Sequence, residues 1–448
     1  MNRPGVSREQ FLELVVRSRL LDAATLHTFA TRHPTASARR LAGALIRAGE
    51  LSRFQAACLL RGTWQGLAVG PYRLLAPLGR GGMATVYLAR DSRLAEEYGD
   101  EVLIALKLLP PRMAREDSQR LARFRREIEL GFRVRHPNVV RTYGGGQADG
   151  VHYLALEFIP GQTVRQIVTR GGRLAVGEAA RIFADVAAGL AHLHERGLIH
   201  RDLKPSNVIV TPAGRAKLLD LGLALVPGEP LPDDPKVVGG RGYIVGTMDY
   251  ISPEQAANAV AVTPRSDLYS LGCSLYFALT GTPPFPGGTS RDKIRRQRTL
   301  DPVPLSELNP AVPPAFARLV AQLMAKDAAQ RPASAAAARE LLLPFATLAA
   351  ENTRVTLRDA LSAVDTAEAH ARLWTEGGDE ADPRPDEDVT GFDPGRTLDR
   401  RESDRHAVVA IPVPLPAVSS RVNVRVAAAI AVAVVLAVVL LALFWGIW

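Results

Sequence analysis

The spacing of apolar residues changes along the chain and divides it into segments. Residues 7–62 carry apolar residues at helical intervals: Phe11 and Val15 are one turn apart, and so are Leu41 and Leu45. This spacing places several apolar side chains on one face of each turn. It therefore predicts a set of short amphipathic helices at the start of the chain.

Start signals for two of these helices can be read from the sequence. Ser7 with Gln10, and Ser52 with Gln55, have the spacing of a capping box, in which each side chain binds the backbone N–H of the other. We expect residues 1–70 to form a helical N-terminal segment that packs against its neighbour. Its ten arginines against four acidic residues leave another interpretation open, a basic face that rests on anionic lipid or on a partner.

A different pattern begins at Pro71, where short apolar runs are typical of strands. One helical pattern interrupts them at residues 117–134, and from Thr163 onward the sequence is mostly helical. Together these patterns predict an α+β fold, with a small β-rich lobe followed by a larger helical lobe. The five expected strands cover residues 72–79, 84–90, 101–109, 139–145 and 152–158.

Two further segments follow the helical lobe. Residues 347–425 lose the periodic pattern and gain proline, glycine and acidic residues, so we expect a flexible tether. Residues 426–448 contain no charge, and as a helix they would extend about 34 Å, enough to cross a hydrocarbon core of about 30 Å. Arg421 and Arg425 precede this run, and basic flanks stay cytoplasmic. The sequence thus predicts a single-pass transmembrane helix in the cell (inner) membrane, with all preceding residues in the cytoplasm and a lipid bilayer as partner.

Composition excludes some classes of protein. The net charge is +9, but no basic stripe is interleaved with aromatic residues, which argues against a nucleic-acid partner. The two cysteines, Cys58 and Cys273, suggest neither a disulfide framework nor a zinc site, which is typical of a reducing compartment. The first ten residues lack the apolar stretch of a signal peptide.

A glycine-rich stretch, LGRGGMATVYLAR at residues 78–90, nearly matches Gly-x-Gly-x-x-Gly, with Ala84 in the third position. By itself this stretch fits a tight hairpin as well as a loop that covers phosphates. About twenty residues later, IALK places Lys107 in an apolar run, where an amine needs an anionic partner. The helix that follows offers Glu127, one of three acidic residues there with Glu116 and Glu129. A Lys107–Glu127 pair could hold the amine against the α- and β-phosphates of a nucleotide.

The stretch GLIHRDLKPSNVIV, followed by KLLDLG, supplies the groups that phosphoryl transfer requires. Such a reaction needs oxygen ligands for Mg²⁺, a carboxylate that orients the attacking hydroxyl, and cations that spread the developing charge. Asn207 and Asp220 can hold the metal ion, Asp202 can accept the hydroxyl proton, and Lys204 can neutralise the γ-phosphoryl group. In this context we interpret the glycine-rich stretch as a cover for phosphates.

These motifs resemble those of the eukaryotic-like (Hanks-type) serine/threonine protein kinases of the membrane-anchored bacterial type. The resemblance covers about Tyr72 to Phe345 and includes GTMDYISPEQ (246–255), SDLYSLGCSLYFALTGTPPF (266–285) and AKDAAQRPAS (325–334). It implies a bilobal protein-kinase fold for residues 71–346. It also implies transfer of the γ-phosphoryl group of ATP, with Mg²⁺ or alternatively Mn²⁺, to serine and threonine hydroxyls of protein substrates.

The resemblance assigns further residues to the nucleotide and to the scaffold around it. The phosphates would lie under Leu78, Gly79, Arg80, Gly81, Gly82, Met83 and Ala84. The adenine would lie among Leu78, Val86, Ala105 and Leu156, with hydrogen bonds from the backbone of Glu157 and Ile159. Glu254 and Arg331 would form a buried ion pair, and Asp267 would brace the loop that carries Asp202.

Two features depart from the family pattern. Leu221 stands where the family usually has phenylalanine, and no serine or threonine occurs between Asp220 and Gly246. Many relatives carry there a phosphothreonine that pairs with the arginine before the catalytic aspartate, here Arg201. We hypothesise that an acidic residue of this segment, or no anion, takes the place of the phosphate. The alternative is that Arg201 bonds only to backbone carbonyls.

Two other functions fit parts of the same sequence. One is a membrane-anchored pseudokinase scaffold, which recruits a partner without catalysis, and the other is a small-molecule phosphotransferase of similar fold. The presence of Lys107, Glu127, Asp202, Asn207 and Asp220 argues against the pseudokinase. The motifs after residue 246 argue against the small-molecule enzyme, since they belong to the protein kinases. A homodimer is compatible with the class, although no residue pattern selects it.

Overall fold

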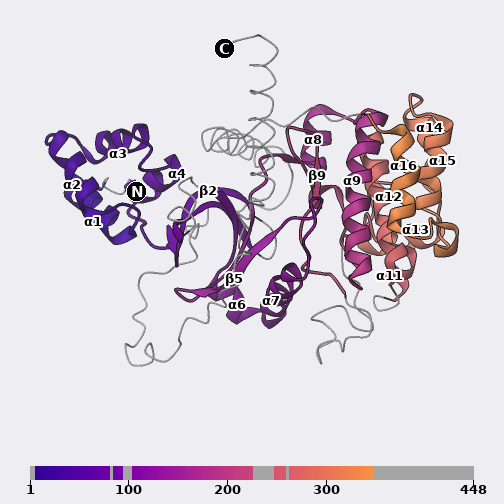
Figure 1. Ribbon diagram of the computed structural model, residues 1–448, viewed down its shortest axis with the longest axis horizontal. Coiled ribbons are helices and arrows are strands. Elements are labelled where there is room, and N and C mark those ends of the chain that lie inside the picture. Colours follow the sequence, from indigo (N-terminus) through magenta and orange to yellow (C-terminus); the bar gives the residue numbers. More distant parts are fainter. Residues whose placement is uncertain (1–5, 81–83, 94–102, 226–246, 259–261, 348–448) are drawn as a thin grey trace, which may run out of the picture. The chain divides into compact units, whose positions relative to one another are not determined.

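The structure is a computed structural model that describes residues 6–80, 84–93, 103–225, 247–258 and 262–347 (Figure 1). Within these ranges no helix is long and apolar enough to cross a membrane. The predicted tether and the apolar run at 426–448 lie outside the described residues.

The N-terminal segment contains the helices that its apolar spacing predicts. Both capping boxes are present, Ser7 with Gln10 and Ser52 with Gln55. Apolar side chains one turn apart point into a shared core in which, for example, Phe11 is fully buried. The four helices are α1 (Arg8–Ser18), α2 (Ala23–Arg32), α3 (Ala38–Arg47) and α4 (Arg53–Leu60). Helix α4 packs against strand β2, so the segment contacts its neighbour as expected.

The β-rich lobe is a six-stranded antiparallel sheet in the order β1-β2-β3-β4-β6-β5. Its strands are β1 (Ala68–Val69), β2 (Tyr72–Arg80), β3 (Thr85–Asp91), β4 (Leu103–Leu109), β5 (Thr142–Ala148) and β6 (Val151–Glu157). The sequence predicted five strands, and β1 was missed because two residues show no alternation. The strand expected at 139–145 begins only at Thr142, since Val139 and Val140 pair with Leu218 instead.

Two helices, and not the single one expected at 117–134, connect β4 to β5. They are α6 (Pro111–Glu116) and α7 (Ser118–Phe132), and α7 packs against β5. Helix α6 was missed although Pro111 occupies a first-turn position, where proline is well tolerated. It is too short for its apolar periodicity to be recognised.

The helical lobe is built around α9 and α12, which contact each other and α16 (Figure 1). Its α-helices are α8 (Val164–Gly171), α9 (Val176–Glu195), α11 (Pro253–Ala257), α12 (Pro264–Thr280), α13 (Ser290–Thr299), α14 (Leu305–Leu308), α15 (Pro314–Leu323) and α16 (Ala335–Leu342). Short 3₁₀ turns are η1 (Pro205–Asn207), η2 (Ala328–Gln330) and η3 (Leu343–Phe345). A small sheet contains β7 (Gln162–Thr163), β8 (Val208–Val210) and β9 (Ala216–Leu218). All residues of α12 from Ser266 to Leu279 are buried, which makes it the core of the lobe.

A buried carboxylate on α12 holds the loop that follows α9. Asp267 is fully buried and accepts hydrogen bonds from the backbone N–H groups of His200 and Arg201, both at 2.9 Å. A third bond, of 2.8 Å, joins it to His194 Nε2 on α9. Burial alone would raise the pKa of Asp267, but the bonds to His194 and to the loop outweigh it and hold this pKa below the ordinary value. Asp267 therefore braces the loop, as the family resemblance implies.

We predict that Asp267→Asn lowers the free energy of unfolding by about 3 kcal/mol at pH 7, because an amide cannot accept all of these bonds. The pKa of Asp267 is lowered by folding, so its contribution is complete above the unfolded value of about 3.9 and is lost as the pH falls below it. When the pH is lowered from 7 to below 4, the free energy of unfolding should therefore fall less for the variant than for the wild type. Urea denaturation followed by circular dichroism at several pH values measures both effects.

Asp292→Asn is the matched control, because this aspartate also lies in the first turn of a helix but is only partly buried and bonds only to the cap residue Thr289. Its substitution should shift the urea midpoint much less. Equal shifts in the two variants would show that Asp267 contributes only as a generic first-turn acid.

Candidate active site

The amine of Lys107 lies in an ion pair between the sheet and α7. Strand β4 pairs with β3 on one side and with β6 on the other, so Lys107 stands in the middle of the sheet. Its Nζ atom is 2.8 Å and 2.7 Å from the two carboxylate oxygens of Glu127. Burial opposes the charge on Lys107, but Asp220 and Glu127 outweigh it and hold the pKa of the ammonium above its usual value. The predicted pair is thus formed, and Lys107 is a cation.

Asp220 approaches the same amine from the helical lobe. Its Oδ1 atom is 3.6 Å from Lys107 Nζ and accepts the N–H of Gly222 at 3.0 Å. Burial would raise the pKa of Asp220, but the Lys107 ammonium and the Gly222 N–H outweigh it and keep this pKa low. A Cβ atom at Gly222 would lie 3.0 Å from Asp220 Oδ1 and 3.3 Å from Glu127 Oε2. Glycine therefore leaves room for both carboxylates.

A second polar cluster lies in the loop between α9 and β8. Lys204 Nζ is 2.6 Å from Asp202 Oδ2, and Asn207 Nδ2 donates to the Asp202 carbonyl at 2.9 Å. Pro205 opens the 3₁₀ turn that ends at Asn207, so the turn directs the amide back toward Asp202. The structure thus brings together Asp202, Lys204 and Asn207.

Thr247 also belongs to this cluster, through contacts that were not predicted from the sequence. Its N–H donates to Asp202 Oδ1 at 3.2 Å, and its hydroxyl accepts from Lys204 Nζ at 2.9 Å. Thr247 is separated from Asp202 by 45 residues, and no local pattern links the two. The GTMDYISPEQ motif marks the threonine, but only the fold shows what it contacts.

The apolar residues assigned to the nucleotide share one face of the sheet. Val86 lies opposite Lys107 in the β3–β4 pair, and Ala105 lies opposite Leu156 in the β4–β6 pair. Directly opposed residues of paired strands point to the same face, as do residues two apart. Val86, Ala105, Leu156 and Lys107 are partly exposed, whereas Leu88 and Leu154 on the same face are fully buried. The face with Lys107 is therefore largely apolar and only partly accessible.

The glycine-rich hairpin is described up to Arg80 and again from Ala84, and Gly81, Gly82 and Met83 lie outside the described residues. The strands converge, with Gly79 opposite Val86 and Arg80 opposite Thr85. Ala84 is buried next to Phe124 of α7, and it is not among the described non-glycine residues with positive φ. A methyl group at the third glycine position is therefore compatible with the backbone.

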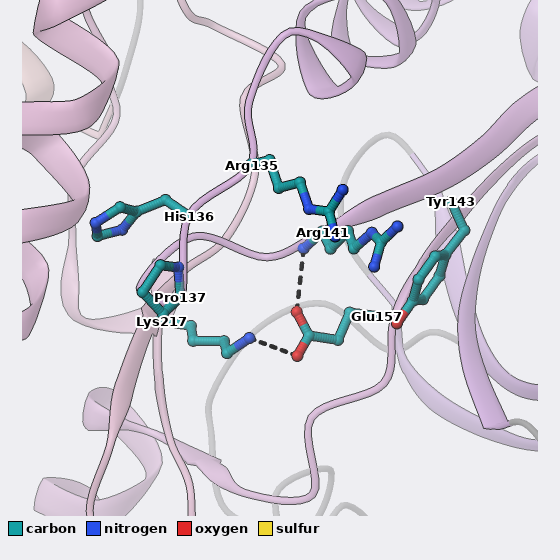
Figure 2. Close-up of a pocket in the computed structure, with 7 residues that line it drawn as sticks. All are labelled: Arg135, His136, Pro137, Arg141, Tyr143, Glu157 and Lys217. Carbon is teal, nitrogen blue, oxygen red and sulfur yellow. Dashed lines mark hydrogen bonds and ion pairs between the residues drawn. The ribbon is translucent and has the colours of Figure 1, made fainter. Parts of the chain in front are cut away.

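The side chain of Glu157, the residue after Leu156, points into a hollow that Arg141 and Lys217 also line (Figure 2). Its carboxylate accepts the N–H of Arg141 at 3.2 Å and pairs with Lys217 of β9 (Figure 2). This leaves only the backbone of Glu157 for the role that the resemblance implies. Ile159, the other residue with an expected backbone contact, is buried.

The expected ion pair in the helical lobe is also formed. Arg331 binds both oxygens of Glu254, at 2.7 Å and 3.0 Å, and the Ser266 hydroxyl donates to the same carboxylate at 2.7 Å. The next residue, Gln255, donates to the carbonyl of Arg201 at 3.0 Å. These contacts tie α11 to α12 and to the loop that carries Asp202.

Two expectations concern the segment after Asp220. Leu221 is buried and belongs to the core of the helical lobe, so leucine fills the position that phenylalanine usually takes in the family. The hypothesis about Arg201 concerns residues 226–246, which lie outside the described residues. Arg201 itself is buried, has a positive φ of 65°, and burial lowers the pKa of its guanidinium to about 10.

Comparison with known proteins gives a consistent result. The family described as "Protein kinase domain" matches residues 72–342. The chain is 37% identical over 276 residues to serine/threonine-protein kinase PknB of Mycolicibacterium smegmatis, covering 61% of this chain and 42% of that protein. It is 37% identical over 273 residues to serine/threonine-protein kinase pkn3 of Myxococcus xanthus, covering 59% and 48%. For serine/threonine-protein kinase PrkC of Bacillus subtilis the identity is 33% over 258 residues, covering 58% and 38%.

The matched part thus spans less than half the length of each of these three relatives. It begins at the first long strand of the sheet and ends with α16, so it contains both polar clusters. Since the family match covers more than half of the sequence and contains the Lys107–Glu127 pair and the Asp202 loop, the chain belongs to the protein kinase family.

Proposed function

We propose that this protein is a serine/threonine protein kinase, which transfers the γ-phosphoryl group of ATP to hydroxyls of protein substrates. One observation carries the proposal: Lys107 contacts both Glu127 and Asp220, while the Asp202 cluster is assembled at the same time. Phosphoryl transfer depends on positioning and on charge stabilisation, so both sets must be in place together.

The side chains present fit a divalent cation. Asn207 uses its Nδ2 group to bind the Asp202 carbonyl, which leaves its amide oxygen free to act as a ligand. Asp220 has a lowered pKa and offers a carboxylate, and oxygen donors of this kind suit Mg²⁺ and Mn²⁺. When bound, the ion would neutralise charge on the phosphates of ATP. Lys107 would bind the α- and β-phosphates beside it.

Asp202 is the group that would accept the proton of the substrate hydroxyl. Lys204 and the N–H of Thr247 bind its two carboxylate oxygens and fix its orientation. Lys204 is shared between Asp202 and Thr247, and from this position it would stabilise negative charge on the transferred group. The printed names of the relatives support serine and threonine as acceptors.

We also propose that the protein acts at the cytoplasmic face of a membrane. Residues 426–448 would cross the bilayer, 347–425 would form the tether, and 71–346 would be the catalytic domain. The support is the uncharged 23-residue run and the arginines that precede it.

We expect Asp202→Asn to lower kcat by about 100-fold to 10,000-fold, because an amide cannot accept the hydroxyl proton. The dissociation constant for ATP should change little, since the Lys107 cluster is untouched. Transfer of labelled phosphate by the full chain, followed by phosphoamino acid analysis, measures the effect and the acceptor. Asp301→Asn, an exposed aspartate of the same lobe, should retain wild-type activity.

Label on tyrosine alone would contradict the proposed acceptor. A wild-type chain that binds ATP but transfers no phosphate would instead support the pseudokinase scaffold.

For the membrane proposal, the full chain should remain in the pellet after alkaline carbonate extraction, and a chain ending at Arg425 should be released. Leu436→Arg should also weaken insertion, because an arginine at the centre of a spanning helix costs about 2.5–3.5 kcal/mol. Leu436→Ala is the control and should stay in the pellet. Release of the unmodified chain would contradict the proposal.

A further inference from the structure

Strand β2 has an irregularity just before the glycine-rich hairpin. Leu74 pairs with Ala89 and Ala76 pairs with Leu88, so Leu75 is an extra residue that faces no partner in β3. Such a bulge bends the strand and increases its twist. The position and angle of the hairpin beyond it therefore depend on how the bulge is held.

Strand β1 covers only the start of the outer edge of β2. It pairs with Tyr72 and Arg73, and the N–H of Leu74 donates to the Leu67 carbonyl; beyond this bond no strand within the described ranges covers that edge. Leu74 and Leu75 are nevertheless buried. Buried carbonyl groups need a hydrogen-bond donor, and here a helix supplies it.

The first turn of α4 provides both donors. The Ser52 hydroxyl donates to the Leu75 carbonyl at 2.5 Å, and Gln55 Nε2 donates to the Leu74 carbonyl at 2.8 Å. The same two residues close the capping box, since Gln55 Oε1 accepts the N–H of Ser52 and Ser52 Oγ accepts the N–H of Gln55. Each side chain thus binds its own helix and the bulge at once, and Gln55 is buried.

The bulge connects these bonds with the face of the sheet that carries Lys107. The side chain of Leu75 packs in a cluster with Leu78 and with Phe158, which directly follows Glu157. Leu78 is itself the extra residue of a second irregularity in β2, between Pro77 and Gly79. On the outer side, Phe54 of α4 contacts the ring of Tyr87, next to Val86, with ring centroids 6.0 Å apart.

We propose that Ser52 and Gln55 are positioning residues for the nucleotide: by holding the carbonyls of Leu74 and Leu75, they set the position of the β2–β3 hairpin over the phosphates of ATP. The start of α4 then contributes to the nucleotide site, whereas the start of α1 does not. This inference rests on the proposed function, in which that hairpin covers ATP.

The chain contains its own control for this proposal. Ser7 and Gln10 form the same capping box at the start of α1, but both are exposed, and their side-chain bonds stay within the first turn of that helix. Gln→Met at either position removes the amide at nearly constant volume and disrupts one capping box. Only the variant at Gln55 also removes a bond to the sheet.

The test compares Gln55→Met with Gln10→Met in the full chain, in detergent. We expect Gln55→Met to raise KM and the dissociation constant for ATP by about twofold to tenfold, the range that corresponds to one neutral hydrogen bond. KM for the protein substrate and kcat at saturating ATP should stay near wild type. Hydrogen exchange of the β2 amides should become faster. Gln10→Met should change none of these quantities.

Ser52→Ala, compared with Ser7→Ala, is an independent test that leaves Gln55 in place, and it should show the same selective effect on ATP. The proposal would be overturned if Gln55→Met and Ser52→Ala left both the ATP affinity and the exchange of the β2 amides unchanged. It would also be overturned if Gln10→Met or Ser7→Ala had the same effects as its matched variant. The dissociation constant for ATP and the exchange rates need no turnover. They therefore decide this proposal even if the wild type transfers no phosphate. A lack of phosphate transfer would overturn only the proposed kinase activity.

Discussion

The ion pairs of Lys107 are the interaction on which the candidate active site depends. An ammonium in the middle of a sheet is tolerated only with anionic partners, and here two carboxylates come from different elements. Glu127 can reach it only if α7 packs against the sheet, and Asp220 only if the segment after β9 lies beneath β4. One charge therefore fixes a helix, a strand and a loop relative to each other.

The helical lobe holds the second cluster by a comparable device. Asp267 binds two successive N–H groups immediately before Asp202, and Gln255 binds the carbonyl of Arg201 between them. The acceptor Asp267 lies in α12 and the donor Gln255 lies in α11, so two helices of this lobe hold the loop in place. Its side chains can then be held close to the geometry that proton transfer needs.

The N-terminal helices extend this logic to the outer edge of the sheet. Capping boxes usually serve only the helix that they start, whereas the pair at Ser52 and Gln55 also binds the bulge of β2. A segment outside the family match is thus hydrogen-bonded to the strand that leads into the glycine-rich hairpin. This arrangement physically connects the first turn of α4 with the strand that precedes the glycine-rich stretch.

The sequence by itself determined the two capping boxes of the N-terminal segment, the order of the β-rich and helical lobes and most of their longer elements, because caps and periodicity are local properties. Lys107 on a strand and Asp202 in a loop could be predicted in this way. Glu127 was one of three acidic candidates for the partner of Lys107, and the role of Asp267 came from the family resemblance. The contacts of Thr247 with Asp202, and of Gln55 with Leu74, could not be predicted. They join residues far apart in the chain through hydrogen bonds that leave no periodic trace, so only the tertiary structure decided them.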